Sequence, residues 1–425
     1  MSPAVESPPA PWLSGWKLSA WAVVAAFGTY FCMYGFRKPF TAGKFEGADI
    51  WGLTPKDLLV VAQVCGYMVS KFVGISVIAA MNPRWRVAAL LGLIGVSHLA
   101  LLLFAVAPAP LNAVCLFLNG LPLGMVFGLV MGFLEGRRAT EALAAGLCVS
   151  FIVADGVTKT VGEAVMTEFG VPEPWMPFAA GCVFALPLLL FAWMLTRIPP
   201  PSAADVDHRS ARTPMTRADR RQLFRRYAPG LVMLVAMYLL VTILRSLRAD
   251  FAPELWKSLG YENPKWLFTL TELLVGVGVL VATGAAVLIR DNRTAFFASL
   301  VTSAVGFGLV AVALAGHAGG WLGGFWFVVL SGLGLYLPYV SVHVSVFERL
   351  IAMTRSVGNL GFLMYLADSF GYLGYVGLLV ADKLVGMTAD KLDLFLGGAT
   401  LAAPVSVLLL IAAAVYFRRT TQSAG

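Results

Sequence analysis

Charged residues are scarce in this sequence of 425 residues. Asp, Glu, Lys and Arg together make up 13% of it, against about 25% in a typical soluble domain. Hydrophobic residues account for 59%, and the mean hydropathy is +0.81. These values exclude a soluble enzyme and predict a protein that lies in a lipid bilayer. No catalytic constellation or soluble domain stands out, so we expect no enzymatic activity.

Clustered metal-binding residues are also lacking. The five cysteines lie singly in apolar stretches without a C-x-x-C motif, and the four histidines share no ligand spacing. These patterns exclude a disulfide framework and make a zinc site improbable. The phosphate-binding pattern G-x-x-x-x-G-K-[ST] is absent as well. We therefore predict neither a metal nor a cofactor.

Long apolar runs, rather than strand-like alternation, dominate the sequence. A hydrocarbon core of about 30 Å needs roughly 20 apolar residues in a helix, because a helix satisfies its own backbone polar groups. The pattern predicts an all-α integral membrane protein with twelve transmembrane helices in two six-helix bundles. The predicted spans are 17–40, 57–80, 86–107, 111–134, 141–164, 176–196, 228–250, 265–289, 294–316, 321–347, 356–380 and 393–417.

One long polar break, rich in Arg, Pro, Ser and Asp, divides the chain near its middle. The loop around Arg86 recurs at Arg293, 207 residues later. Two similar halves in the same orientation predict a transporter whose substrate binds between them. The predicted divisions are an N-terminal segment at 1–16, a six-helix bundle at 17–196, a basic linker at 197–227, a second bundle at 228–417 and a tail at 418–425.

Basic residues are distributed unevenly over the predicted loops. Nineteen Lys and Arg residues fall in the segments on the side of the termini, and seven fall in the opposite segments. Because cytoplasmic loops are enriched in Lys and Arg, both termini are predicted to be cytoplasmic. The net charge of +8 then lies mostly at the inner face, which indicates membrane lipid and not nucleic acid as its partner. We expect a monomer in a bacterial inner membrane.

Two arginines lie in or against predicted helices at equivalent positions of the two halves. Arg37 and Arg245 are 208 residues apart, which would place them opposite one another across a central cavity. Two guanidinium groups match phosphate or carboxylate oxygens, so one interpretation is an anion clamp closed from both halves. The other is that Asp250 or Glu272 neutralises each arginine, or that each reaches the outer headgroups. The charges alone leave both interpretations open.

Other ionisable residues lie inside the predicted spans, where charge is expensive and normally faces a cavity or a partner. Lys71 lies 14 residues into its helix, about 21 Å from the outer end, and would add a third cation to the cavity or pair with Asp155 or Glu163. Asp155, Lys159 and Glu163 are spaced i, i+4, i+8, and we favour a self-neutralising ladder over substrate contact. A proton-coupling role for Asp155 or Glu163 stays open.

Two further acids and one histidine complete the set of candidates. Glu272 and Asp368 are isolated acids, and either is a candidate counter-ion for an empty arginine site. His343 lies within a predicted helix beside Pro338 and Tyr339, where it would line the cavity. A lone histidine is more often a packed, hydrogen-bonded residue, so both interpretations of His343 stand.

Several segments resemble the major facilitator superfamily and, within it, the organophosphate:phosphate antiporters that carry glycerol-3-phosphate and hexose phosphates. Glu272, His343 and Glu348 also fall where similar residues are expected. The order and spacing of the segments, from the first span to the eleventh, make the resemblance fairly specific. The segments are YFCMYGFRKPF at 30–40, GYMVSKF at 66–72 followed by NPR at 82–84, LRSLRADFAP at 244–253 and FGYLG at 370–374.

The resemblance implies that Arg37 and Arg245 grip the phosphoryl group of the substrate, with Lys38 and Lys71 adjoining them. Tyr34, in the tyrosine-rich run, is a further substrate-binding candidate. The sequence departs from the family in its fifth span, where a His-Asn-x-Gly-Gly-like stretch is replaced by SFIVADG at 150–156 followed by Lys159. Substrate identity and coupling mode are therefore left open by the resemblance.

The sequence predicts a secondary transporter of a small organic anion, with an organophosphate exchanged for inorganic phosphate by alternating access. One alternative is a proton-coupled sugar or carboxylate permease, in which Asp155, Glu163 or Asp368 would have the central role. Another is a transporter-like sensor that binds its ligand without transporting it.

Overall fold

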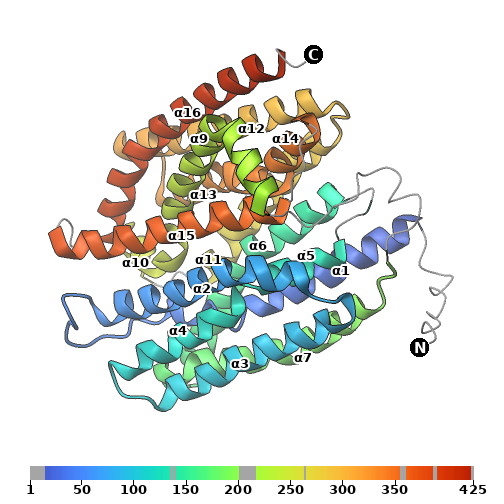
Figure 1. Ribbon diagram of the computed structural model, residues 1–425. Coiled ribbons are helices and arrows are strands. Elements are labelled where there is room, and N and C mark those ends of the chain that lie inside the picture. The colour runs from blue at the N-terminus through green and yellow to red at the C-terminus, as the bar shows by residue number, and fades with distance from the viewer. Residues whose placement is uncertain are drawn as a thin grey trace, which may run out of the picture.

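The structure is a computed structural model that describes residues 15–134, 137, 140–200, 217–262, 265–354, 360–385 and 390–422. Within these ranges the regular elements are helices, and strand-like pairing is limited to one bridge between Ile50 and Leu53. The predicted all-α class is confirmed. Figure 1 shows two helical bundles, one coloured blue to green and the other yellow-green to red.

The N bundle contains the helices before residue 200, with short 3-10 turns η1 to η3 at its corners. Its elements are α1 (Gly15–Tyr34), η1 (Pro39–Ala42), α2 (Pro55–Ala80), η2 (Pro83–Trp85), α3 (Arg86–Val106), α4 (Leu111–Leu123), α5 (Val126–Leu134), α6 (Thr140–Thr167), η3 (Glu173–Trp175) and α7 (Met176–Thr196).

The C bundle contains the helices after residue 216 and includes one π-helical turn, η4. Its elements are α9 (Arg217–Asp250), α10 (Ala252–Ser258), α11 (Lys265–Val287), α12 (Asn292–Ala318), α13 (Gly324–Ser341), η4 (Val342–Val346), α14 (Phe347–Thr354), α15 (Leu360–Val385) and α16 (Lys391–Gln422).

Eleven helical stretches among the described residues are long and apolar enough to cross a membrane. Helix α1, with 20 residues, lies in the first predicted span, 17–40, but ends at Tyr34. Outward-facing side chains such as Leu186 and Leu401 are 76% and 73% exposed, as expected for groups that contact lipid. The chain is a multi-pass membrane protein.

Proline residues interrupt two of the predicted spans, and a helix bends just before a third. Pro122 lies at the end of α4, and a new helix, α5, starts at Val126. Pro338 lies in α13 just before the π-helical turn η4. Helix α9 bends at Tyr227, whose backbone leaves the helical region two residues before Pro229. A proline has no N–H to donate and its ring crowds the preceding turn, so each break follows from the local sequence.

The predicted linker at 197–227 differs from the structure at its C-terminal end. Residues from Arg217 onward are helical and form the first turns of α9, whereas residues 201–216 lie outside the described residues. The first turn of α1 and the last turn of α16 lie toward the same side of the molecule, the terminal side (Figure 1). The opposite side, where α1 ends and α16 begins, is the far side.

The two bundles meet along two helix pairs, α2 with α15 and α6 with α11. Helix α6 is the most enclosed candidate span, with 83% of its most apolar stretch buried. Gly156 permits the close approach to α11, because a Cβ atom at this position would lie 2.2 Å from the Phe268 carbonyl oxygen. Polar residues of α6 therefore face the bundle interface and not lipid.

Two glycines set the crossing of α2 and α4 within the N bundle. A Cβ atom at Gly66 would lie 2.1 Å from the Phe117 carbonyl oxygen, and one at Gly120 would lie 2.1 Å from the Gln63 carbonyl oxygen. Both clashes are with backbone, which cannot move aside as a side chain can. Small residues at helix contacts are the usual means of close packing in lipid, where helices gain nothing from hiding apolar surface.

Replacing Gly120 by Ala should therefore lower the apparent Tm of the purified protein, because overpacking costs typically about 1–3 kcal/mol. The matched control is Gly92→Ala on α3, where nothing lies within 4 Å of the added Cβ atom. The control should leave the Tm unchanged or slightly raised, since Ala favours helix over Gly. Equal Tm values for the two variants would contradict close packing at Gly120.

Candidate functional site

Arg37 lies in the tight turn that follows α1 and is buried, with 3% of its surface exposed. Helix α1 ends at Tyr34, so the chain turns before it reaches the far surface. Gly35 permits this turn, because a Cβ atom there would lie 2.1 Å from the Phe184 ring. The guanidinium is thereby held inside the protein and away from the headgroups.

Aromatic rings surround the Arg37 guanidinium. Its central carbon lies 3.8 Å from the centre of the Tyr67 ring and about 6 Å from the rings of Tyr34 and Tyr372, at 5.9 and 6.0 Å. The guanidinium makes no hydrogen bond to the described residues, and its buried Nε has no acceptor. Cation–π attraction therefore compensates part of the cost of burying this charge.

Arg245 occupies the equivalent position in the C bundle, on α9, and is 5% exposed. Its guanidinium lies 4.3 Å from the centre of the Tyr339 ring and 5.9 Å from that of Tyr336. Its Nη2 donates to the hydroxyl of Ser246 at 3.2 Å and to that of Tyr372 at 3.4 Å.

The two arginines converge on one ring, that of Tyr372. Arg37 faces this ring from the N bundle, and Arg245 donates to its hydroxyl from within the C bundle. Among the described residues no carboxylate lies within ion-pair distance of either guanidinium, because Asp250 is paired with Lys38 and Glu272 with Arg248. The interpretation that Asp250 or Glu272 pairs with these arginines is therefore wrong, and so is the one that places them at the headgroups.

Lys38 and Lys71 both form ion pairs that join the two bundles. Lys38 donates to Asp250 at the end of α9, and its Nζ lies 3.4 Å from Asp155 on α6. Lys71 on α2 lies 2.8 Å from Asp368 on α15. Lys71 was expected to pair with Asp155 or Glu163 if it was not a free cation, and its partner is instead an acid of the other bundle.

Asp368 is also the centre of a buried polar cluster. Tyr238 donates a hydrogen bond to its Oδ1, and the Nε2 of His343 lies 3.6 Å from the same oxygen. His343 belongs to the π-helical turn η4 and is packed against the rings of Phe127 and Tyr339, at 5.8 and 4.6 Å. The predicted role of Asp368 as a counter-ion thus applies to Lys71 and not to an arginine.

The predicted ladder on α6 forms in its first step. Lys159 pairs with Asp155 one turn away, and both are buried. Glu163, one turn further, is half-buried. The Asp155–Lys159 step of the predicted ladder is thereby confirmed.

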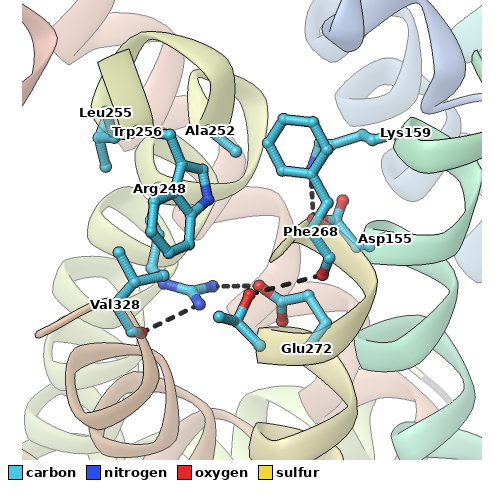
Figure 2. Close-up of a pocket in the computed structure, with 11 residues that line it drawn as sticks. Asp155, Lys159, Arg248, Ala252, Leu255, Trp256, Phe268, Glu272 and Val328 are labelled. Carbon is cyan, nitrogen blue, oxygen red and sulfur yellow. Dashed lines mark hydrogen bonds and ion pairs between the residues drawn. The ribbon is translucent and has the colours of Figure 1, made fainter. Parts of the chain in front are cut away.

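A small pocket opens between α6 and the C bundle beside these residues (Figure 2). The Asp155–Lys159 pair of α6 lies on one side of the pocket, and Glu272 of α11 lies on the other with Arg248 of α9. Arg248 donates to Glu272 at 2.7 Å and to the Val328 carbonyl at 3.2 Å. The aromatic rings of Trp256 and Phe268 complete the walls.

The charges around this pocket cancel. Three buried cations, Lys38, Lys159 and Arg248, face three buried acids, which are Asp155, Asp250 and Glu272. Lys71 is likewise matched by Asp368. Two positive charges, those of Arg37 and Arg245, therefore remain without an ion-pair partner among the described residues of this region.

Sequence reasoning missed several residues of the site. Arg248 was not among the predicted site residues, although it lies three residues after Arg245 and therefore on nearly the same helix face. The aromatic residues Tyr67, Tyr336, Tyr339 and Tyr372 lie on three different helices. Tyrosines are common in apolar helices, and only the packing of α2, α13 and α15 brings these four around the arginines.

Ion pairs between the bundles close the site toward both sides of the molecule. On the far side Lys56 pairs with Glu254 at 2.6 Å, and Asp57 pairs with Lys391 at 2.9 Å. On the terminal side Glu141 pairs with Arg349 at 2.7 Å.

Comparison with solved structures finds a similar fold in the crystal structure of a D-xylose–proton symporter. The TM-score is 0.59, with 13% sequence identity over 93% of this chain and 96% of the symporter chain. This likeness confirms the predicted major facilitator fold. The neighbour is a sugar symporter, so the narrower resemblance to organophosphate antiporters stays a prediction.

The sequence comparisons are less specific. No curated protein matches the sequence. A family model described as "Family of unknown function (DUF5690)" matches residues 39–420. The matched region begins two residues after Arg37, so it leaves out α1 and contains the later helices of both bundles.

The ion pair between Arg248 and Glu272 yields a test of the buried charges. Arg248→Met should lower the apparent Tm strongly, because removing one partner of a buried pair costs about 3–5 kcal/mol. Replacing both residues, as Arg248→Met with Glu272→Leu, should restore most of the loss, since no unpaired charge then remains. A double variant that is less stable than the single variant would show that the two charges are not coupled.

Proposed function

The chain belongs to the family of unknown function whose model matches residues 39–420, and on that premise we propose that it is a secondary transporter of an organic anion. It would work by alternating access. The observation that carries the proposal is the pair of buried arginines, one from each bundle, which share the Tyr372 ring and have no acid partner among the residues that the structure describes. A buried charge without a partner is costly in a membrane protein and usually marks a substrate pathway. An anion that bridges Arg37 and Arg245 would remove this cost.

The chemistry of the two arginines favours a phosphoryl group. A guanidinium presents a planar fork of N–H donors that matches two oxygens of one phosphate, and two such forks match a doubly charged group. The Tyr372 hydroxyl, which already accepts from Arg245, supplies a further polar contact. We therefore propose an organophosphate as the transported anion and inorganic phosphate as its exchange partner.

Exchange follows from the charges of the site. Without an anion the two guanidinium groups repel one another, so the bundles would close around an empty site only at a cost. A bound anion offsets this repulsion and permits the closed form that precedes reopening on the other side. The inter-bundle ion pairs of the far and terminal sides would open in turn, with the termini in the cytoplasm of a bacterial cell.

A second candidate function is that of a proton-coupled sugar permease. The pocket of Figure 2 favours it, because its charges cancel and carboxylates beside aromatic rings suit a neutral polyhydroxylated ligand. The similar fold of the D-xylose–proton symporter is compatible with this function. Uptake of labelled sugar driven by a pH gradient, without phosphate inside the vesicles, would identify this function.

The proposal predicts the effect of replacing each arginine by lysine. Proteoliposomes loaded with inorganic phosphate should take up labelled phosphate by counterflow, and Arg37→Lys or Arg245→Lys should reduce this uptake at least about tenfold. Lysine keeps the charge but loses the fork, and each lost hydrogen bond to a charged group costs about 1.5–3 kcal/mol.

The matched control is Arg290→Lys, at an exposed position next to α12, which should transport like the wild type. Normal counterflow by both site variants would refute the clamp. Phosphate-dependent thermal stabilisation of the wild type without counterflow would instead indicate a sensor, which binds its ligand but does not transport it.

A further inference from the structure

We infer that the His343 ring carries hydrogen on both nitrogens, as the imidazolium cation, while the two bundles are closed against each other. The extra proton, on Nε2, moves with the anion. The inference rests on the proposed transport function and adds the proton as a second ligand. It is carried by the hydrogen bonds around His343, in the π-helical turn η4 between Phe127 of the N bundle and Asp368 of the C bundle. Such turns are frequent at functional sites.

The first step concerns the Nδ1 atom of His343. It lies 2.9 Å from the backbone carbonyl oxygen of Tyr339. A carbonyl oxygen can only accept a hydrogen bond, so Nδ1 has to be the donor and carries a hydrogen. Any neutral form of the ring therefore has its lone pair on Nε2.

The second step concerns what Nε2 faces. It lies 3.4 Å from the hydroxyl oxygen of Tyr238 and 3.6 Å from Oδ1 of Asp368. The single hydroxyl hydrogen of Tyr238 is donated to Asp368. A lone pair on Nε2 would therefore face two oxygen atoms that have no hydrogen to offer it. A hydrogen on Nε2 turns this repulsion into attraction, and the ring is then the imidazolium cation.

The surrounding charges are compatible with that cation. Asp368 is flanked by Lys71 on one oxygen and would be flanked by the imidazolium on the other. The titratable groups that face the cluster are Tyr238 of α9, Asp368 of α15, Tyr339 of α13, Lys71 of α2 and Cys148 of α6. Two neighbouring helices bring polar groups that already have partners. Arg349 of α14 is paired with Glu141, and Ser299 of α12 is hydrogen-bonded to Ser345.

The ring of Tyr339 connects this cluster to the arginine site. It lies 4.3 Å from the Arg245 guanidinium on one side and 4.6 Å from the His343 ring on the other. A proton on His343 therefore adds positive charge one ring away from Arg245, and all three side chains are buried. An anion held by the arginines favours that proton and the proton favours the anion, because coupling between two bound ligands is reciprocal. Closing thus requires both.

The test is the pH profile of phosphate counterflow in proteoliposomes, from about pH 6 to about pH 9. His343→Gln has no ionisable group at this position, so its rate divided by the wild-type rate should rise with pH, by up to about tenfold per pH unit, as only the wild type loses the proton. The ionisation of phosphate itself cancels in this ratio. The control is His317→Gln on α12, whose ring packs against Phe327 at 4.8 Å, and its ratio should stay constant.

Nitrogen-15 NMR of histidine-labelled protein, with His343→Gln to assign the signal, reads the same proton without any ligand. Hydrogen on both ring nitrogens of His343 at neutral pH is expected, and a bare Nε2 would overturn the inference even if His343→Gln lacks all transport. A rate ratio independent of pH for His343→Gln would overturn the coupling. Absence of counterflow in the wild type would instead overturn the proposed function. The NMR signal would then still show whether Nε2 of His343 carries a hydrogen.

Discussion

The main physical constraint on this structure is positive charge that is buried without an ion-pair partner among the described residues. Arg37 and Arg245 lie inside a membrane protein at 3% and 5% exposure, where even lenient scales assign a charged residue a cost of about 2.5–3.5 kcal/mol. Other buried charges of the region are matched by acids, but these two are surrounded by tyrosine rings. Rings attract cations weakly compared with a carboxylate. The rings therefore compensate the two charges only in part, which is the basis of the proposal that the site binds an anion.

The arrangement of the ion pairs would allow such a molecule to close and reopen without leaving a buried charge unpaired. Lys38 reaches Asp250 in the C bundle and Asp155 in its own bundle. If the far side opens as the proposed alternating access requires, Lys38 would lose Asp250 of the C bundle and keep Asp155 of its own bundle, so it would not become an unpaired buried cation. Arg248 and Glu272 belong to one bundle and stay together in either state. Pairs that cross the interface act as contacts that can break, and pairs within a bundle maintain its charge.

Much of the fold follows from local sequence. Apolar runs of sufficient length predict spanning helices, because the backbone has no other way to satisfy its polar groups in lipid. The prolines at Pro122 and Pro338 break or distort predicted spans, and this effect is also local. The start of α9 inside the predicted linker was not predictable in the same way. That stretch is rich in arginine, and nothing in its polarity distinguishes a solvated helix from a loop.

The equivalence of Arg37 and Arg245 could be predicted from their spacing in two repeated halves, and so could the burial of Lys71, Asp155 and Asp368 from their depth in apolar runs. The sequence by itself therefore determined that these charges lie inside and that they must be compensated. Only the tertiary structure decided which acid meets which base, that Asp368 takes Lys71 and Glu272 takes Arg248, and that five tyrosines enclose the arginines. Pairing depends on helix rotation and crossing distance between segments far apart in the chain, and side-chain spacing along one helix carries no information about either.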